Sequence, residues 1–213
     1  MPAGGKRAIA GLALASWLCC PFAARAGDDK PPRPSSVFLR LAAGPAYMRE
    51  GSHADGAGNS AADTFGWGPT LEVTVGRKLA SRWVVAGSLQ LTGIFNRGET
   101  FRGHTYELSS TAHLVDVVAA LIDYRPNLRW KFHLGGSLGI VAASEIDTYN
   151  GATQTNWGVA ASLHASQDLL RLRRWSMGVV ARLTYYHYGA ADPAPPTTFD
   201  GILPSLLVAF TRD

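Results

Sequence analysis

Three Arg-Trp pairs recur along the chain at nearly equal spacing, and each opens a stretch in which apolar residues alternate with small or polar ones. The pairs are Arg82-Trp83, Arg129-Trp130 and Arg174-Trp175, which follow one another after 47 and 45 residues. Alternation with a period of two predicts β-strands with two unlike faces. Because tryptophan favours the membrane–water interface, a tryptophan at the start of each strand indicates one rim of a membrane β-barrel.

The same alternation can be followed through eight segments. Each is at least as long as the roughly 9–11 residues that a tilted strand needs to cross a bilayer. Segment 111–123 is apolar on both faces, and Pro45, Pro69 and Pro204 lie inside strands, where each removes a hydrogen-bond donor. The predicted fold class is all-β, an eight-stranded antiparallel up-and-down transmembrane β-barrel. Its predicted strands are 36–48, 65–76, 83–95, 111–123, 130–141, 156–166, 175–188 and 199–210.

The two faces of these strands differ in character. One face is apolar and almost without charge, whereas the other carries small residues and isolated polar groups. A soluble lipocalin-like barrel would place the apolar face inside, but its solvent face should then carry several charges per strand. We therefore expect the polar face to line a crowded lumen, since an eight-stranded interior is only wide enough for side chains to fill it. The predicted lumen residues are Arg40, Glu72, Gln90, Asp116, Lys131, His133, His164 and Arg182.

Two interpretations of this polar set remain open. Burying a charge without a partner is costly, so mutual ion pairing that closes the barrel is the simpler one. A conducting pathway or a proton relay is the alternative. The tryptophans of the barrel lie on the apolar face near strand ends, which is typical of the aromatic girdles at the two interfaces. They are Trp67, Trp83, Trp130, Trp157 and Trp175.

The first 26 residues have the layout of a secretory signal peptide. Lys6 and Arg7 precede an apolar run that Pro21 interrupts, and a small-x-small site ends at Ala26. Residues 1–26 are therefore predicted to be a cleaved signal peptide, 27–35 an extended periplasmic leader and 36–213 the barrel. Both cysteines, Cys19 and Cys20, fall inside the signal, so no disulfide is expected in the barrel, and the residues before them do not resemble a lipoprotein signal.

Charge argues against nucleic acid as a partner. Removal of the signal leaves nearly equal numbers of acidic and basic residues, without the basic stripe that nucleic-acid binding requires. Charged residues make up 17% of the chain, below the roughly 25% of a typical soluble protein.

The connections between strands alternate between long and short. Since outer-membrane barrels place short turns in the periplasm and long loops outside, both termini are predicted to be periplasmic.

On these features the chain resembles the family of small eight-stranded outer-membrane β-barrels, which includes the barrel domain of outer membrane protein A and the outer membrane protein W group. The resemblance covers about residues 36–210 and rests on the architecture, the tryptophan rims and the last strand with Leu206, Val208 and Phe210. It implies a location in the outer membrane of a Gram-negative bacterium, contact with outer-membrane lipid and insertion by the barrel assembly machinery. In this family a terminal aromatic strand is read by that machinery, whereas here three residues follow Phe210.

An enzymatic role on lipid A is a further hypothesis, because some eight-stranded barrels act on outer-leaflet lipid with a histidine and a serine at the outer rim. His187 is predicted to face lipid near the outer end of its strand, with Asp192 and Asp200 nearby. Gly189 occupies the place where a deacylase would carry its serine, so no catalytic residue is assigned. The six histidines are dispersed without metal-ligand spacing, and neither a metal nor another cofactor is expected.

The function predicted from the sequence is therefore that of a monomeric outer-membrane barrel with a plugged polar lumen and a structural or loop-mediated interaction role. The polar tract 49–64 is interpreted as a solvated linker, with ligand binding as its alternative. A narrow channel for small or apolar solutes is the second hypothesis, and a lipid A-modifying enzyme is the third. The external ligand or partner cannot be named from the sequence.

Overall fold

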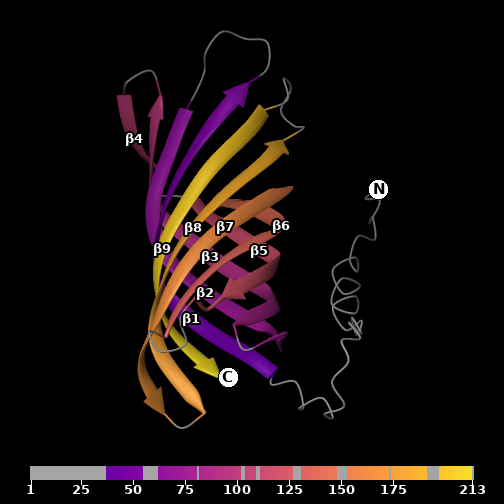
Figure 1. Ribbon diagram of the computed structural model, residues 1–213. Helices are drawn as coiled ribbons and strands as arrows, with labels where there is room; N and C mark the ends of the chain where they lie inside the picture. Colours follow the sequence, from indigo (N-terminus) through magenta and orange to yellow (C-terminus); the bar gives the residue numbers. More distant parts are fainter. Residues whose placement is uncertain are drawn as a thin grey trace, which may run out of the picture. The chain divides into compact units, whose positions relative to one another are not determined.

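The computed structural model describes residues 37–54, 62–80, 82–101, 104–108, 111–126, 131–147, 153–172, 174–190 and 197–212. These residues form nine β-strands (Figure 1): β1 (Val37–Ala54), β2 (Ala62–Lys78), β3 (Trp83–Phe101), β4 (His104–Leu108), β5 (Thr111–Tyr124), β6 (Phe132–Asp147), β7 (Thr153–Leu172), β8 (Trp175–Ala190) and β9 (Thr197–Arg212). The predicted signal peptide and leader, 1–26 and 27–35, lie outside the described residues. Among the described residues, no helix is long and apolar enough to cross a membrane.

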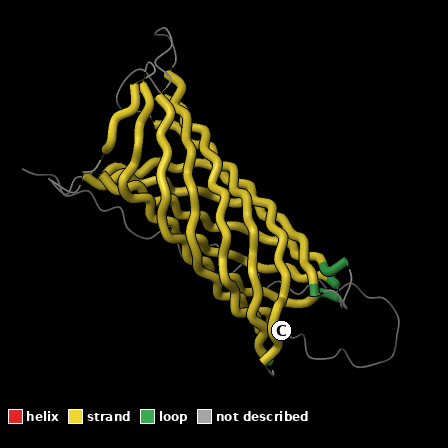
Figure 2. The backbone as a smooth tube through the Cα atoms, turned by 90° about the vertical axis from the view of Figure 1, so that its left-hand side faces the viewer, coloured by secondary structure: helices red, strands yellow, loops and turns green. Residues whose placement is uncertain are grey.

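Eight of the nine strands form the wall of a closed barrel. Consecutive wall strands pair antiparallel in the order β1, β2, β3, β5, β6, β7, β8 and β9, and β9 pairs back onto β1. At this closing pair, Leu41 lies opposite Phe210 and Ala42 lies opposite Ala209. Figure 2 shows the strands winding side by side around the barrel at a tilt, as closure of a sheet requires. The predicted eight-stranded antiparallel barrel is confirmed.

Burial alternates along the wall and places the apolar face outside. Leu138, Leu163 and Trp67 are 73%, 71% and 65% exposed, whereas the charged Arg40 and Glu72 are each only 2% exposed. A soluble barrel would show the opposite arrangement, because water favours polar groups on its surface. The lipocalin-like alternative is therefore wrong, and the exposed apolar belt is the surface that meets the acyl chains of a bilayer.

Several strands extend further than the alternation predicted. β1 continues to Ala54 and β2 begins at Ala62, so the ends of the tract 49–64 are strand rather than linker. The short strand β4 lies inside the predicted loop 96–110 and pairs with Arg97–Phe101 of β3. These parts stand at the end of the barrel opposite the short turns (Figure 1), here called the outer end because the sequence predicts its long connections to lie outside the cell. At this end both faces of a strand can meet water, and the alternation is no longer required.

The wall is irregular where its prolines meet. Pro45 of β1 lies directly opposite Pro69 of β2, and neither can donate a backbone hydrogen bond. Gly68 allows β2 and β3 to approach closely at this level, because a Cβ atom there would lie 1.7 Å from the carbonyl oxygen of Gly93. The register between β2 and β3 also shifts between Phe65 and Trp67. The first three strands therefore form a local irregularity in an otherwise regular wall.

Candidate functional site

The charged groups of the lumen gather first around Glu72 of β2. Its Oε1 atom lies 3.0 Å from Nη2 of Arg40 and 2.9 Å from Nη2 of Arg182, and all three side chains are buried. The hydroxyl of Thr74 donates to the same oxygen at 2.7 Å. The second guanidinium nitrogen of Arg182 donates to Gln90 Oε1 at 3.4 Å. One carboxylate thus links two arginines that approach it from β1 and β8.

A second buried carboxylate, Asp123 of β5, extends this group toward the end of the barrel that carries the short turns. Asp123 lies 3.5 Å from Arg40, 3.3 Å from His133 Nδ1 and 3.7 Å from His164 Nε2. The other ring nitrogen of His133 lies 3.7 Å from Asp168, which is partly exposed. We call this connected set the Glu72 network. Its members are Glu72, Arg40, Arg182, Gln90, Thr74, Asp123, His133, His164 and Asp168.

A separate polar group lies nearer the outer end of the lumen. The hydroxyl of Tyr186 donates to Glu50 Oε2 at 3.0 Å, and His113 Nε2 lies 3.7 Å from the same oxygen. Arg97 contacts His113 Nδ1 at 3.0 Å and donates to Glu145 at 2.7 Å. We call these five residues the Glu50 network. It contains one arginine and two carboxylates, one of which, Glu145, is half exposed.

Apolar side chains separate the two networks along several strands. On β1, Met48 lies between Arg40 and Glu50, and it is fully buried. On β5, Val115 and Val117 lie between Asp123 and His113. The remaining members of this apolar layer come from other strands and pack with them in one cluster; they include Ile94, Val141, Ala143 and Leu203. Since a charged or hydrated path would have to cross this layer, the arrangement favours a closed lumen.

Most of the predicted lumen residues do face the interior. Arg40, Glu72, Gln90, His133, His164 and Arg182 are all buried, and all six belong to the Glu72 network. Two predictions of position were wrong. Asp116 shares the outward face of β5 with the exposed Val118, because its neighbours Val115 and Val117 point inward. Lys131 is exposed in the turn before β6, with a φ of 51°.

The Glu50 network was missed from the sequence, together with Asp123 and Asp168. Glu50 and Arg97 fall in segments that were predicted to be loops, and Asp168 falls in a predicted turn. His113 and Asp123 belong to the strand that is apolar on both faces, so alternation did not identify its inward side. Glu50 lies at an even spacing from Arg40 and Met48, so extending the first predicted strand by two residues would have placed Glu50 on the inward face.

The outward face carries a smaller polar cluster at the outer rim. His187 Nδ1 lies 2.9 Å from Asp200 Oδ1, and the hydroxyl of Tyr185 also donates to this carboxylate. His53 Nε2 lies 4.0 Å from the other carboxylate oxygen. His187 thus lies on the outward face of β8, beside Asp200. Gly189 is the second residue after His187, so no serine follows this histidine on β8.

The tryptophans lie on the outward face where the structure describes them. Trp67, Trp83 and Trp157 are exposed, and Trp175 is partly buried. Trp67 pairs with Tyr47 at 5.0 Å between ring centroids, and Trp83 pairs with Tyr124 at 4.5 Å. Trp130 lies outside the described residues. Among the described residues there is no group of three or more His, Cys, Asp or Glu side chains placed to hold a metal ion.

Comparison with solved structures identifies the type of barrel. Neisserial surface protein A aligns with 83% of this chain and 98% of its own, with a TM-score of 0.53 and 12% identity. The outer membrane protein OprG from Pseudomonas aeruginosa aligns with 83% of this chain and 96% of its own, with a TM-score of 0.47 and 13% identity. No protein-family model and no curated protein matches the sequence. The chain has the fold of the small outer-membrane β-barrels, and an outer-membrane location agrees with its exposed apolar belt.

Proposed function

We propose that this protein is a monomeric outer-membrane barrel with a closed lumen, and that it acts as a structural component or through contacts made by its outer surface. The observation that carries this proposal is the apolar layer between the Glu72 network and the Glu50 network. Paired charges on either side of an apolar layer rigidify a barrel rather than form a path through it. Export by a cleaved signal peptide and insertion by the barrel assembly machinery are parts of the same proposal.

The alternative, a narrow channel for small solutes, is tested by conductance. We expect the purified barrel to give no steady current in planar bilayers of phosphatidylcholine. The double variant Arg40→Met/Glu72→Gln removes both partners of a buried ion pair, and we expect it to unfold more readily without gaining a current. A large and steady conductance in either protein would instead support a gated pathway and overturn the closed-lumen proposal.

A lipid-modifying enzyme is the second candidate, and the pairing of His187 with Asp200 favours it. A carboxylate that holds Nδ1 of a histidine leaves Nε2 available as a general base. Against it, Gly189 stands on β8 at the second position after His187, where a serine nucleophile would be expected. Mass spectra of lipid A from cells that express the protein would separate the candidates. An altered acylation pattern that disappears in His187→Gln would support the enzyme, whereas an unchanged pattern would exclude lipid A as its substrate.

A further inference from the structure

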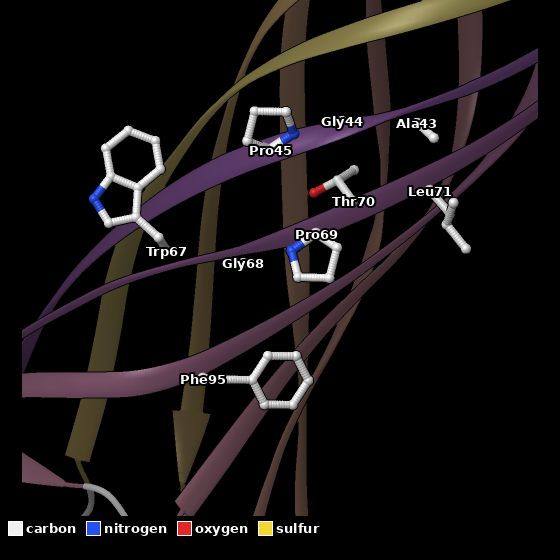
Figure 3. A pocket seen from close by; sticks show the side chains of 9 residues that line it. All are labelled: Ala43, Gly44, Pro45, Trp67, Gly68, Pro69, Thr70, Leu71 and Phe95. Carbon is white, nitrogen blue, oxygen red and sulfur yellow. The ribbon is translucent and has the colours of Figure 1, made fainter.

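The irregular region around the paired prolines forms a groove in the lipid-facing wall. Figure 3 shows the side chains that line it, on β1, β2 and β3. The groove has a volume of about 560 Å³, and Trp67, Leu71 and Phe95 stand around it. Pro45 and Pro69 lie between these larger side chains. The surface of the barrel is therefore hollowed at this point, within the belt that meets acyl chains.

The hollow follows from the residues at its floor. Ala43, Pro45 and Pro69 are short side chains on the outward face, and they occupy places where other strands carry leucine or valine. Gly68 brings β2 and β3 together beneath them, as does Gly44 for β1 and β9, where a Cβ atom would lie 2.1 Å from the carbonyl oxygen of Leu206. A larger residue at Gly44 or Gly68 could not close the hollow from inside the barrel, because its side chain would overlap the backbone of the neighbouring strand.

A second hollow continues the groove toward the outer end of the barrel. It has a volume of about 590 Å³, and it shares Trp67 and Phe95 with the first. Tyr47, Phe65 and Gly66 complete its lining, and Tyr47 lies directly opposite Trp67 in the register of β1 and β2. The two hollows together form one apolar groove with aromatic walls, whose outer end lies at the level of an amphipathic tyrosine–tryptophan pair.

Arg49 stands at the outer end of this groove. It is the next outward residue of β1 after Tyr47, and it lies directly opposite Phe65. Its Nη2 atom donates to Asp63 at 2.9 Å, and both side chains are exposed, so this ion pair is weak. A guanidinium has five N–H donors, and one bond to Asp63 leaves several for another oxyanion. Guanidinium groups bind phosphate in a bidentate manner.

We propose that this groove is a binding site for a phosphorylated glycolipid of the outer leaflet, of the lipid A type. One acyl chain lies in the groove between Trp67 and Phe95, and a phosphate of the head group binds Arg49. Two independent features support this occupant. The apolar groove suits a hydrocarbon chain, and the cationic Arg49 lies at the end of the groove where a head group of the outer leaflet would be. This inference goes beyond the proposed function and requires neither a closed nor an open lumen.

The test is native mass spectrometry of the purified, folded barrel in detergent with three added lipids. These are bis-phosphorylated lipid A, chemically dephosphorylated lipid A and phosphatidylethanolamine. We expect one lipid A per barrel, bound about tenfold more tightly than its dephosphorylated form because the guanidinium–phosphate contact adds to chain burial. We also expect lipid A to bind more tightly than phosphatidylethanolamine, whose single phosphodiester is neutralised by its own ammonium group. Equal binding of dephosphorylated lipid A would overturn the phosphate contact, and equal binding of phosphatidylethanolamine would overturn the choice of a glycolipid.

Two variants assign the binding to this groove. Ala43→Leu fills the floor, and we expect it to weaken the binding of both forms of lipid A. Arg49→Gln keeps the groove, and we expect it to abolish the preference for the phosphorylated form while dephosphorylated lipid A binds as before. The matched controls are Ala120→Leu on the outward face of β5 and Arg171→Gln on β7, both at exposed positions. If the controls change binding as much as the variants do, the site is elsewhere and the proposal is wrong.

Discussion

The buried charges show how single residues decide whether this barrel is stable. Glu72 is the central carboxylate of its network, since it meets the guanidinium groups of both Arg40 and Arg182. Glu72 and Arg40 come from the consecutive strands β2 and β1, whereas Arg182 comes from β8 near the other end of the chain. A buried ion pair is not in itself a large source of stability, but removing one partner leaves the other charge uncompensated. The arginines therefore depend on Glu72.

Replacing Glu72 with glutamine keeps its shape and removes its charge. We expect Glu72→Gln to lower the free energy of unfolding by about 3–5 kcal/mol, because two buried guanidinium groups lose their shared carboxylate. The measurement is urea unfolding of the barrel in phosphatidylcholine vesicles, followed by tryptophan fluorescence. Glu107→Gln on the exposed strand β4 is the control, for which no change is expected. A Glu72→Gln barrel as stable as the parent would mean that water solvates the arginines.

Asp116 is the opposite case, a carboxylate on the outward face within the apolar belt. It lies between Leu91 of β3 and Ala142 of β6. We expect Asp116→Leu to raise the free energy of unfolding in vesicles by about 1–2 kcal/mol, because carboxylates on a lipid-facing wall are destabilising, though less so than lysine or arginine. Ala120→Leu on the same face separates the loss of charge from the gain of apolar area. A destabilised Asp116→Leu barrel would indicate that this carboxylate has a favourable partner in the membrane.

The sequence could predict the lumen only where one face of a strand is clearly apolar. Arg40, Glu72 and Arg182 were assigned correctly because their neighbours in the strand are lipid-facing leucines and valines. The prediction for Asp116 was wrong because β5 is apolar on both faces, so alternation does not show which face meets lipid. The charge alone predicted an inward position for this side chain. Which charges meet across the lumen depends on the strand register, which the sequence does not contain.

At the scale of the strands, the structure differs from the prediction mainly at the outer end. Apolar and polar residues alternate only where one face of a strand meets lipid. The pattern therefore identifies the part of each strand inside the membrane, but not the part above it. β1, β3 and β6 are therefore longer than predicted, and β4 was missed altogether. Glu50, Arg97 and Glu145 of the Glu50 network lie on these extensions. Two of the short turns fall close to their predicted positions, whereas β7 runs on to Leu172, past its predicted end at 166.

The pairing of β2 with β3 depends on the absence of a side chain at Gly68. We expect Gly68→Ala to reduce the yield of folded barrel strongly, because its Cβ atom would overlap the backbone oxygen of Gly93. The measurement is the fraction of protein that shows a heat-dependent shift in gel mobility after refolding. Gly189→Ala is the matched control, since nothing lies within 4 Å of a Cβ atom there. Equal yields for the two variants would show that β2 and β3 can separate at this level without cost.

At the scale of the whole molecule, the barrel is held together by the pairing of its first and last strands. Without this pairing the sheet would have two exposed edges in lipid, where unsatisfied backbone groups are very costly. The sequence predicted the number of strands and their direction, from which closure followed. It could not predict the irregular junction near Pro45 and Pro69, since a proline in a strand indicates a missing donor and not which residue lies opposite.

Closure can be tested by a cross-link between Ala42 and Ala209, which lie directly opposite each other. We expect Ala42→Cys/Ala209→Cys to form a disulfide in the folded barrel, because directly opposite residues of an antiparallel pair have Cα atoms about 4.5–5.5 Å apart. The cross-linked chain should migrate faster than its reduced form after boiling. The control Ala42→Cys/Ala119→Cys joins β1 to β5, which are not neighbours, and should remain reduced. A disulfide in the control alone would contradict the strand order.

Strand β4 carries one consequence for a membrane crowded with copies of this protein. In the part of the chain that the structure describes, β4 pairs only with β3, so one of its edges has backbone groups without a strand beside them. Such an edge can recruit a strand from another molecule, and long apolar edges lead to aggregation. β4 has five residues and carries the exposed His104 and Glu107. A short, charged edge is a poor template, so neighbouring barrels would pack densely without joining their sheets.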